Sequence, residues 1–171
     1  MSAFPLTRRA ALAALAGLAL PSAVAVRSAL AQPNVRFRDI VVDVSPLRAS
    51  MGDPTAAWVE KELNGALAQA LAAYMAPGDR HGATLVARID DLYLGPSSGG
   101  VGPWGASQDT INGMLFVRGA RGGPAGGAPI RAIASYHPMG VDQPLRTESN
   151  YWRVVALAQA FAGWAPRELG L

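Results

Sequence analysis

Two segments of the chain repeat apolar residues at steps of three and four, and this pattern limits the possible folds more than any other feature. The first follows Asp53-Pro54, and its apolar positions are Val59, Leu63, Ala66, Leu67, Ala70 and Tyr74. The second starts near Ser149 or Asn150, and its apolar positions are Tyr151, Val154, Leu157, Ala158, Phe161, Ala162 and Ala165. Such spacing predicts two helices with one apolar side each. Each helix therefore needs another element to cover that side.

The ends of the two helices are marked by prolines. Asp53-Pro54 predicts a start, because Asp can cap the free N–H groups and Pro suits the first helical position. The sequence Pro77-Gly78-Asp79 predicts the end of the first helix. Pro166 disfavours helical geometry at Ala165, so we expect the second helix to break there.

Four segments have the composition and alternation of strands. They are Val35–Val44, Ala83–Leu94, Thr110–Arg118 and Ile130–Tyr136. The first contains Ile40-Val41-Val42, which is apolar on both faces, a pattern typical of a central strand.

Two glycine-rich stretches separate the last three strands. Residues 95–106 and 119–129 each contain five Gly and two Pro. We expect both to be mobile loops between antiparallel strands.

The element order is therefore β-α-β-β-β-α, which predicts an α+β fold. Two helices with one apolar side each are expected to cover one face of a common sheet. The prediction is a two-layer sandwich with a four-stranded, largely antiparallel sheet and two helices on one face. The first helix could connect the first strand to a parallel neighbour, which would make the sheet mixed.

The N-terminal segment has the layout of an export signal. Arg8 and Arg9 precede an uncharged run, and Ala29-Leu30-Ala31 has small residues where a signal peptidase cleaves. Residues 1–31 are thus expected to be removed, which leaves residues 32–171 as a single periplasmic domain without a transmembrane segment. A cut after Ala25 and an uncleaved N-terminal anchor are the alternatives.

The segment Thr7-Arg8-Arg9-Ala10-Ala11-Leu12-Ala13 resembles the twin-arginine export motif. The arginine pair and Leu12 match the motif, whereas Ala11 stands where Phe is usual. The resemblance implies export in the folded state, with the general export route as the alternative. Gln32 stands where a lipoprotein has its Cys, so we expect no lipid anchor.

Charge and cysteine content exclude several classes of function. The chain has 15 Lys and Arg and 12 Asp and Glu, and three of the arginines lie in residues 1–31, which leaves 15 − 3 = 12 basic residues against 12 acidic ones. A domain without surplus positive charge is not expected to bind nucleic acid. The chain has no Cys, which excludes disulfides, thiolate metal sites and a Cys nucleophile.

Two glycine-rich motifs match catalytic or cofactor patterns only formally. Residues 95–99 fit G-x-S-x-G and residues 100–105 fit G-x-G-x-x-G. Both patterns need a helix to follow directly, and the sequence predicts loop and then strand there. We therefore predict no catalytic residue and no cofactor.

The acidic and histidine residues form no recognisable metal pattern. Asp90 and Asp91 are adjacent on a strand, so their side chains are expected on opposite faces. Asp91 shares the face of the apolar residues before it, and we expect it to leave the core or to pair with an arginine. His81 lies in a turn and His137 at a strand end, without zinc-ligand spacing. His137 is nevertheless a candidate binding residue, although a histidine at a strand end more often has a structural role.

Trp104 is the second candidate binding residue. It lies in the middle of the first glycine-rich stretch, where an exposed aromatic side chain suits an anchor for a partner. The alternative is that it folds back onto the sheet. Trp58, Trp152 and Trp164 fall in the predicted helices, where core or helix-edge positions are expected.

Two segments carry a family resemblance. Arg88–Leu94 and Ala162–Leu169 resemble matching segments of small exported bacterial proteins of uncharacterised function. The element order is also similar to that of envelope accessory lipoproteins, such as the lipopolysaccharide-assembly accessory protein and transporter-auxiliary lipoproteins. The resemblance implies a role in the cell envelope and identifies no catalytic residue.

The sequence thus favours a non-enzymatic periplasmic domain that binds a protein partner or supports envelope assembly. Its partner would be an unidentified protein or envelope component, bound through an exposed sheet face or the two loops. A hydrolase with an unrecognised site is one alternative. A carrier with an apolar cavity for a small ligand is the other.

Overall fold

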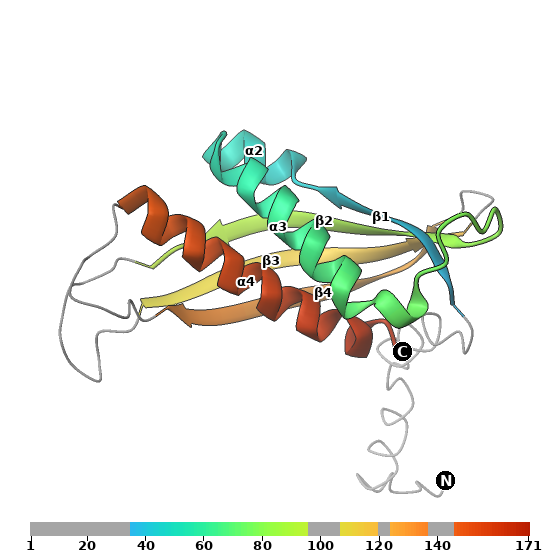
Figure 1. The fold of residues 1–171 in the computed structure, drawn as a ribbon. Coiled ribbons are helices and arrows are strands. Elements are labelled where there is room, and N and C mark those ends of the chain that lie inside the picture. Colours follow the sequence, from blue (N-terminus) through green and yellow to red (C-terminus); the bar gives the residue numbers. More distant parts are fainter. Residues whose placement is uncertain (1–34, 96–106, 120–123, 137–145) are drawn as a thin grey trace, which may run out of the picture.

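A computed structural model describes residues 35–95, 107–119, 124–136 and 146–171 of the 171-residue chain (Figure 1). Its elements are β1 (Phe37–Asp43), α2 (Ser45–Met51), α3 (Thr55–Ala70), the short 3₁₀ helix η1 (Ala72–Tyr74), β2 (Ala83–Tyr93), β3 (Ser107–Arg118), β4 (Pro124–Tyr136) and α4 (Arg146–Glu168). The strands form one sheet in the order β1-β2-β3-β4. β1 and β2 are parallel and the other neighbours antiparallel. The predicted α+β fold with a mixed, largely antiparallel sheet is confirmed.

Helices α3 and α4 lie side by side across one face of this sheet (Figure 1). The apolar sides predicted for them are the sides that are buried, with α3 against β1 and α4 against β4 and β3. The largest side chains of this core are fully buried, and they include Phe37, Leu63, Leu67, Leu85, Ile89, Ile111, Leu115, Leu157 and Phe161. The core therefore lies between the sheet and the two helices.

Gly113 permits the close approach of α4 to the middle of β3. A Cβ atom at this position would lie 3.3 Å from the ring of Phe161 and only 2.4 Å from the backbone oxygen of Arg88. Any side chain here would push β2 and α4 away from β3, so the glycine is required by packing.

The region between β1 and α3 differs from the prediction. Helix α2 occupies it, with Pro46 in its first turn and Leu47 fully buried. The expected cap of α3 by Asp53 is wrong, because the residue before the helix is Pro54 and no side chain caps it. The Asp53 carboxylate instead accepts a hydrogen bond from Arg48.

The predicted break of the last helix at Pro166 is also wrong, because α4 continues to Glu168. Ala165 and Leu169, on either side of the proline, are both buried in the core. The backbone N–H of Leu169 donates to the oxygen of Ala165 at 3.0 Å. Burial on one side of the last turn thus outweighs the hydrogen bond that Pro166 cannot make.

Two strand assignments require correction. β4 starts at Pro124, so the second half of the loop predicted at 119–129 is a strand, where Gly127 pairs with Phe116 and Ala128 with Leu115. The pattern of β1 suggested a central strand, but β1 lies at the edge of the sheet.

Candidate functional site: the uncovered face of the sheet

The two candidate binding residues, Trp104 and His137, lie outside the described residues, as does the N-terminal segment 1–31. Of the glycine-rich motif at 95–99, only Gly95 is described. His81 is exposed in the turn before β2. The geometry available for a site is therefore that of the sheet and the three helices.

The face of the sheet opposite α3 and α4 is not covered by any element among the described residues (Figure 1). Side chains alternate between the two faces of a strand, so every second residue of each strand points to this uncovered face. On β3, for example, Ile111 and Leu115 are buried in the core, whereas Met114 and Phe116 are only partly buried. We call this surface the open face.

Apolar side chains form a continuous band across the open face. The register places Val41, Val86, Phe116 and Gly127 in one row across the four strands. Met114 and Pro129 are paired in the next row. A Cβ atom at Gly127 would lie 2.9 Å from the Phe116 ring and 3.1 Å from the terminal methyl of Met114. Both side chains therefore lie across β4 in place of the side chain that Gly127 lacks.

Two further apolar residues extend the open face beyond this band. Tyr93 is 54% exposed and Ile133 is 48% exposed, and both are aligned with Thr110 of β3. Val41, within the band, is 42% exposed. Three large apolar side chains are thus about half in contact with water on one surface.

Charges of opposite sign lie on opposite halves of the open face. β1 and β2 carry four acidic residues and two arginines: Asp39, Asp43, Asp90, Asp91, Arg38 and Arg88. β3 and β4 carry Arg118 and Arg131, and their one acidic residue, Asp109, points into the core. The formal sums are 2 − 4 = −2 for the acidic half (β1 and β2) and +2 for the basic half (β3 and β4).

The neighbouring carboxylates of β2 have different partners. The register between β2 and β3 shifts between Ile89 and Asp91, which marks an irregularity such as a β-bulge. Because of this shift, Leu92 enters the core and Asp91 leaves it, where the side chain of Asn112 donates to Asp91 at 3.3 Å. Of the two outcomes expected for Asp91, departure from the core is the one found. Asp90 is the residue that pairs with an arginine, Arg88, at 2.8 Å.

One arginine side chain, that of Arg88, contacts the apolar band directly. The guanidinium carbon of Arg88 lies 5.4 Å from the centre of the Phe116 ring, a distance typical of a cation–π contact.

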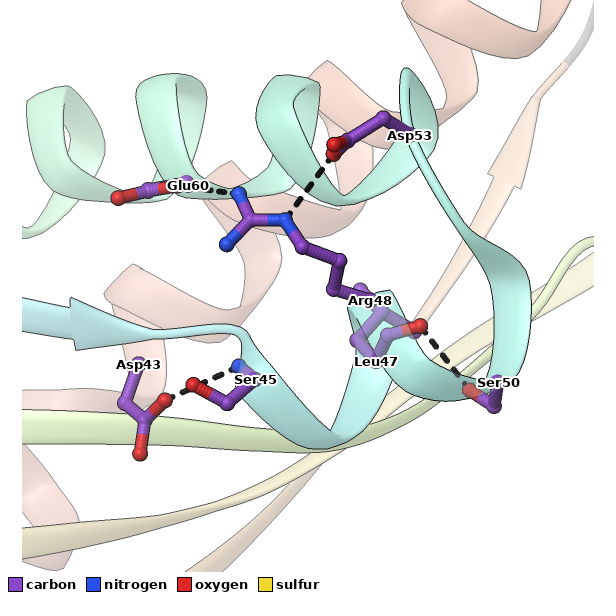
Figure 2. Close-up of polar contacts among 7 residues, drawn as sticks. All are labelled: Asp43, Ser45, Leu47, Arg48, Ser50, Asp53 and Glu60. Carbon is purple, nitrogen blue, oxygen red and sulfur yellow. Dashed lines mark hydrogen bonds and ion pairs between the residues drawn. The ribbon is translucent and has the colours of Figure 1, made fainter.

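At the end of β1, Asp43 accepts hydrogen bonds from Ser45, which Figure 2 shows. These bonds, followed by the charges of Arg88 and Arg118, hold the pKa of Asp43 below its ordinary value of 3.8. The carboxylate is therefore ionised wherever the protein is folded near neutral pH.

A buried ion pair closes the core at one end of the sheet. Arg153 of α4 donates through Nε to Asp109 of β3 at 2.8 Å and through Nη2 to the other oxygen of the same carboxylate. Arg153 also donates to the backbone oxygen of Gly95 and to the side chain of Asn150, and the N–H of Gly95 donates to Asp109. The described part of the chain contains no buried side-chain polar atom without a partner. Sequence reasoning missed this pair, because neither residue belongs to a motif.

A second arginine joins α2 to α3 at the surface. Arg48 donates to Asp53 and to Glu60, both at 3.1 Å, as Figure 2 shows. The hydrogen bonds to these two carboxylates raise the pKa of Arg48 above its ordinary value. All three side chains are about half exposed, so these ion pairs connect the two helices at the solvent-exposed surface.

Aromatic residues of α3 and α4 contact one another. The Trp58 and Tyr151 rings meet edge to face at 5.8 Å, and the Tyr151 and Trp152 rings at 5.5 Å. The hydroxyl of Tyr151 donates to Glu62 at 2.9 Å, which ties α4 to α3. This hydrogen bond raises the pKa of Tyr151. Trp58 and Tyr151 are therefore packing residues between the helices, at the helix edge that was expected for Trp58.

The described residues contain no group of three or more His, Asp or Glu side chains arranged to hold a metal ion. No described helix is long and apolar enough to cross a membrane. The open face combines apolar area with arginine and carboxylate side chains on one sheet surface.

No protein-family model matches this chain, and no curated protein sequence matches it. A PelC dodecamer from Paraburkholderia phytofirmans shares 8% identity at a TM-score of 0.41, covering 78% of this chain and 89% of the other. A minor lipoprotein from Acinetobacter baumannii shares 11% identity at the same TM-score, covering 78% and 93%. At these values, neither similarity assigns a function or a relationship to this chain.

Proposed function

We propose that the chain is an exported domain of the cell envelope that works by binding a protein partner through the open face. The observation that carries the proposal is the apolar band with three half-exposed side chains in and beside it, Val41, Tyr93 and Ile133, on a sheet face that no described element covers. Arg88, Arg118 and Arg131 lie on the same strands. Antiparallel sheets with one solvated face usually carry polar residues on that face. Apolar and aromatic side chains with arginines at their rim have the composition of a protein interface.

Export is the second part of the proposal, and residues 1–31 support it. The arginine pair, the short uncharged run and the small residues before Gln32 have the layout of a removable signal. We propose the twin-arginine route, because Arg8, Arg9 and Leu12 match its motif. A periplasmic location follows from cleavage after Ala31.

We further propose that the domain acts without catalysis. The one buried carboxylate among the described residues, Asp109, is engaged by Arg153 and by the backbone of Gly95. A general acid or base needs a hydrogen bond to its substrate, and the contacts of Asp109 are used to hold α4 and the strand ends together. Trp104 and His137, which lie outside the described residues, remain proposed binding residues.

Site-specific photo-crosslinking in intact cells tests the binding proposal. A photoreactive amino acid replaces Ile133 on the open face or, as a control of similar exposure, Trp152 on α4 (both 48% exposed). We expect a defined protein adduct from position 133 and none of the same size from position 152. Position 104 tests the loop candidate in the same way. Equal labelling from positions 133 and 152, or none from position 133, contradicts the proposal.

A further inference from the structure

We propose that the partner which the open face fits is a second copy of this chain, packed sheet against sheet about a two-fold axis parallel to the strands. The inference rests on the proposed function, because it uses the same face. It commits that face to one occupant on the basis of the distribution of charge and apolar area across the four strands.

The distribution of charge over the open face favours a second copy as the partner and a two-fold axis parallel to the strands. Rotation about an axis parallel to the strands places β1 and β2 of one copy over β4 and β3 of the other. The acidic half, with a formal charge of −2, then lies opposite the basic half, with +2, on both sides of the axis. A two-fold axis across the strands would instead place like charges together. Self-complementarity of this kind is what an isologous dimer requires.

The apolar band fits the same rotation. It runs across all four strands at one level, so a rotation about the strand direction returns the band to the same level. Val41 and Val86 of one copy then face Phe116 and the Gly127 region of the other. Stacked sheets lie about 10 Å apart, with side chains of the inner faces interdigitated. Over Gly127, the opposing valine of β1 would meet the Phe116 ring and the terminal methyl of Met114, which lie across β4 there.

The area of the open face indicates how tightly two copies are expected to bind. Four strands about 4.8 Å apart and about six residues at 3.3 Å each give a face of roughly 20 Å by 20 Å. This is about 400 Å² on each copy and about 800 Å² in total, less than the roughly 1,200 Å² of a stable interface and in the range of weak, transient contacts. We therefore expect a reversible dimer with a Kd on the order of micromolar, rather than an obligate one.

Sedimentation velocity of the protein produced from its full-length sequence tests this inference. The dimer fraction is expected to rise between about 1 and 100 µM, the range that brackets a micromolar Kd. In the double variant Val41→Thr/Ile133→Thr, a hydroxyl replaces an exposed methyl group at Val41 and an exposed ethyl group at Ile133, and the variant is expected to raise Kd about tenfold. Trp152→Gln removes a side chain of equal exposure from α4, and it is expected to leave Kd unchanged.

A charge exchange tests the axis itself. The variant Arg118→Glu/Arg131→Glu makes both halves of the open face acidic, and Asp39→Lys/Asp91→Lys makes both halves basic. Each variant alone is expected to dimerise about tenfold more weakly or worse. An equal mixture of the two is expected to recover a heterodimer as strong as the unaltered dimer. Circular dichroism confirms that each variant is folded.

The outcomes separate this inference from the proposed function. A folded protein that remains monomeric at the highest concentration overturns the second copy as partner, and the crosslink from position 133 to another protein then still supports the proposed function. A dimer weakened by Trp152→Gln but not by the open-face variants overturns the inference as well. A dimer that fails to recover in the mixture of charge variants overturns the two-fold arrangement.

Discussion

Two arginines, Arg153 and Arg48, hold helices in place with the same chemistry in opposite surroundings. Arg153 joins α4 to the ends of β2 and β3, with 5% of its side chain and none of that of Asp109 exposed. Arg48 joins α2 to α3, with about half of its side chain and of its two carboxylate partners exposed (Figure 2). The contact between Arg153 and Asp109 is thus inside the core, whereas the contacts of Arg48 are exposed to water.

The surroundings of the two arginines determine which of these contacts the fold depends on. A buried ion pair contributes little net stability relative to an apolar replacement, but loss of one partner leaves an uncompensated charge in the core. An exposed pair is screened by water and salt, so its loss is nearly neutral. Arg153 is therefore a structural requirement at the end of the sheet, whereas Arg48 is a local brace.

The largest effect is expected for Arg153→Met. The change removes the guanidinium and leaves Asp109 buried with only the N–H of Gly95 as partner. We expect a loss of about 3–5 kcal/mol in the free energy of unfolding, because a buried charge remains unpaired. Urea denaturation followed by circular dichroism measures it.

The matched control is the double variant Arg153→Met/Asp109→Asn. It removes the stranded charge and keeps an oxygen that can accept from the N–H of Gly95. We expect it to be more stable than the single variant by about 1–3 kcal/mol. If both variants lose less than about 1 kcal/mol, the contrast between the buried and the exposed arginine is wrong.

Tyr151→Phe is expected to have an intermediate effect. It deletes the hydroxyl that donates to Glu62 and leaves the edge-to-face contacts with Trp58 and Trp152 in place. A partly buried hydrogen bond to a carboxylate contributes about 1 kcal/mol, and the thermal midpoint should fall accordingly. Trp164→Phe, on an exposed part of the same helix, is the control and should show no comparable shift.

Arg48→Gln is expected to lower the free energy of unfolding only slightly, since the pairs with Asp53 and Glu60 are exposed. The cost should disappear in about 1 M salt, where the screening length is about 3 Å. Denaturation with urea at low and high salt measures both numbers. A cost that persists unchanged at high salt would place Arg48 in the same class as Arg153.

The smallest effect is expected for Asp43→Asn, and it depends on pH. The pKa of Asp43 in the folded protein is below its ordinary value of 3.8, because Ser45 and then Arg88 and Arg118 favour the ionised form. Its contribution to stability is therefore complete above that ordinary value and is lost as the pH falls through the lowered one. Thermal melts should show the variant slightly less stable at neutral pH, and the difference should vanish in strong acid. A difference that grows on acidification contradicts this assignment.

Local patterns were sufficient for most of the helices and strands. The three- and four-residue repeats of α3 and α4 identify the buried sides correctly, since an amphipathic helix has only one side that it can bury. The same patterns failed where a distant partner decides the outcome. Residues 124–129 look like a loop by composition, and they form a strand because β3 pairs with them. Pro166 remains helical because Ala165 and Leu169 are buried.

The candidate site divides in the same way. The proposed export signal follows from the order of residues alone, and so does the balance of 12 basic and 12 acidic residues that its removal would leave, because both depend on composition along the chain. The open face and its two charged halves depend on the order of the strands, which brings together residues from β1 to β4. The buried pair of Arg153 and Asp109 joins residues 44 positions apart. Only the tertiary structure decided these features, because pairing and burial depend on contacts between segments that are distant in the sequence.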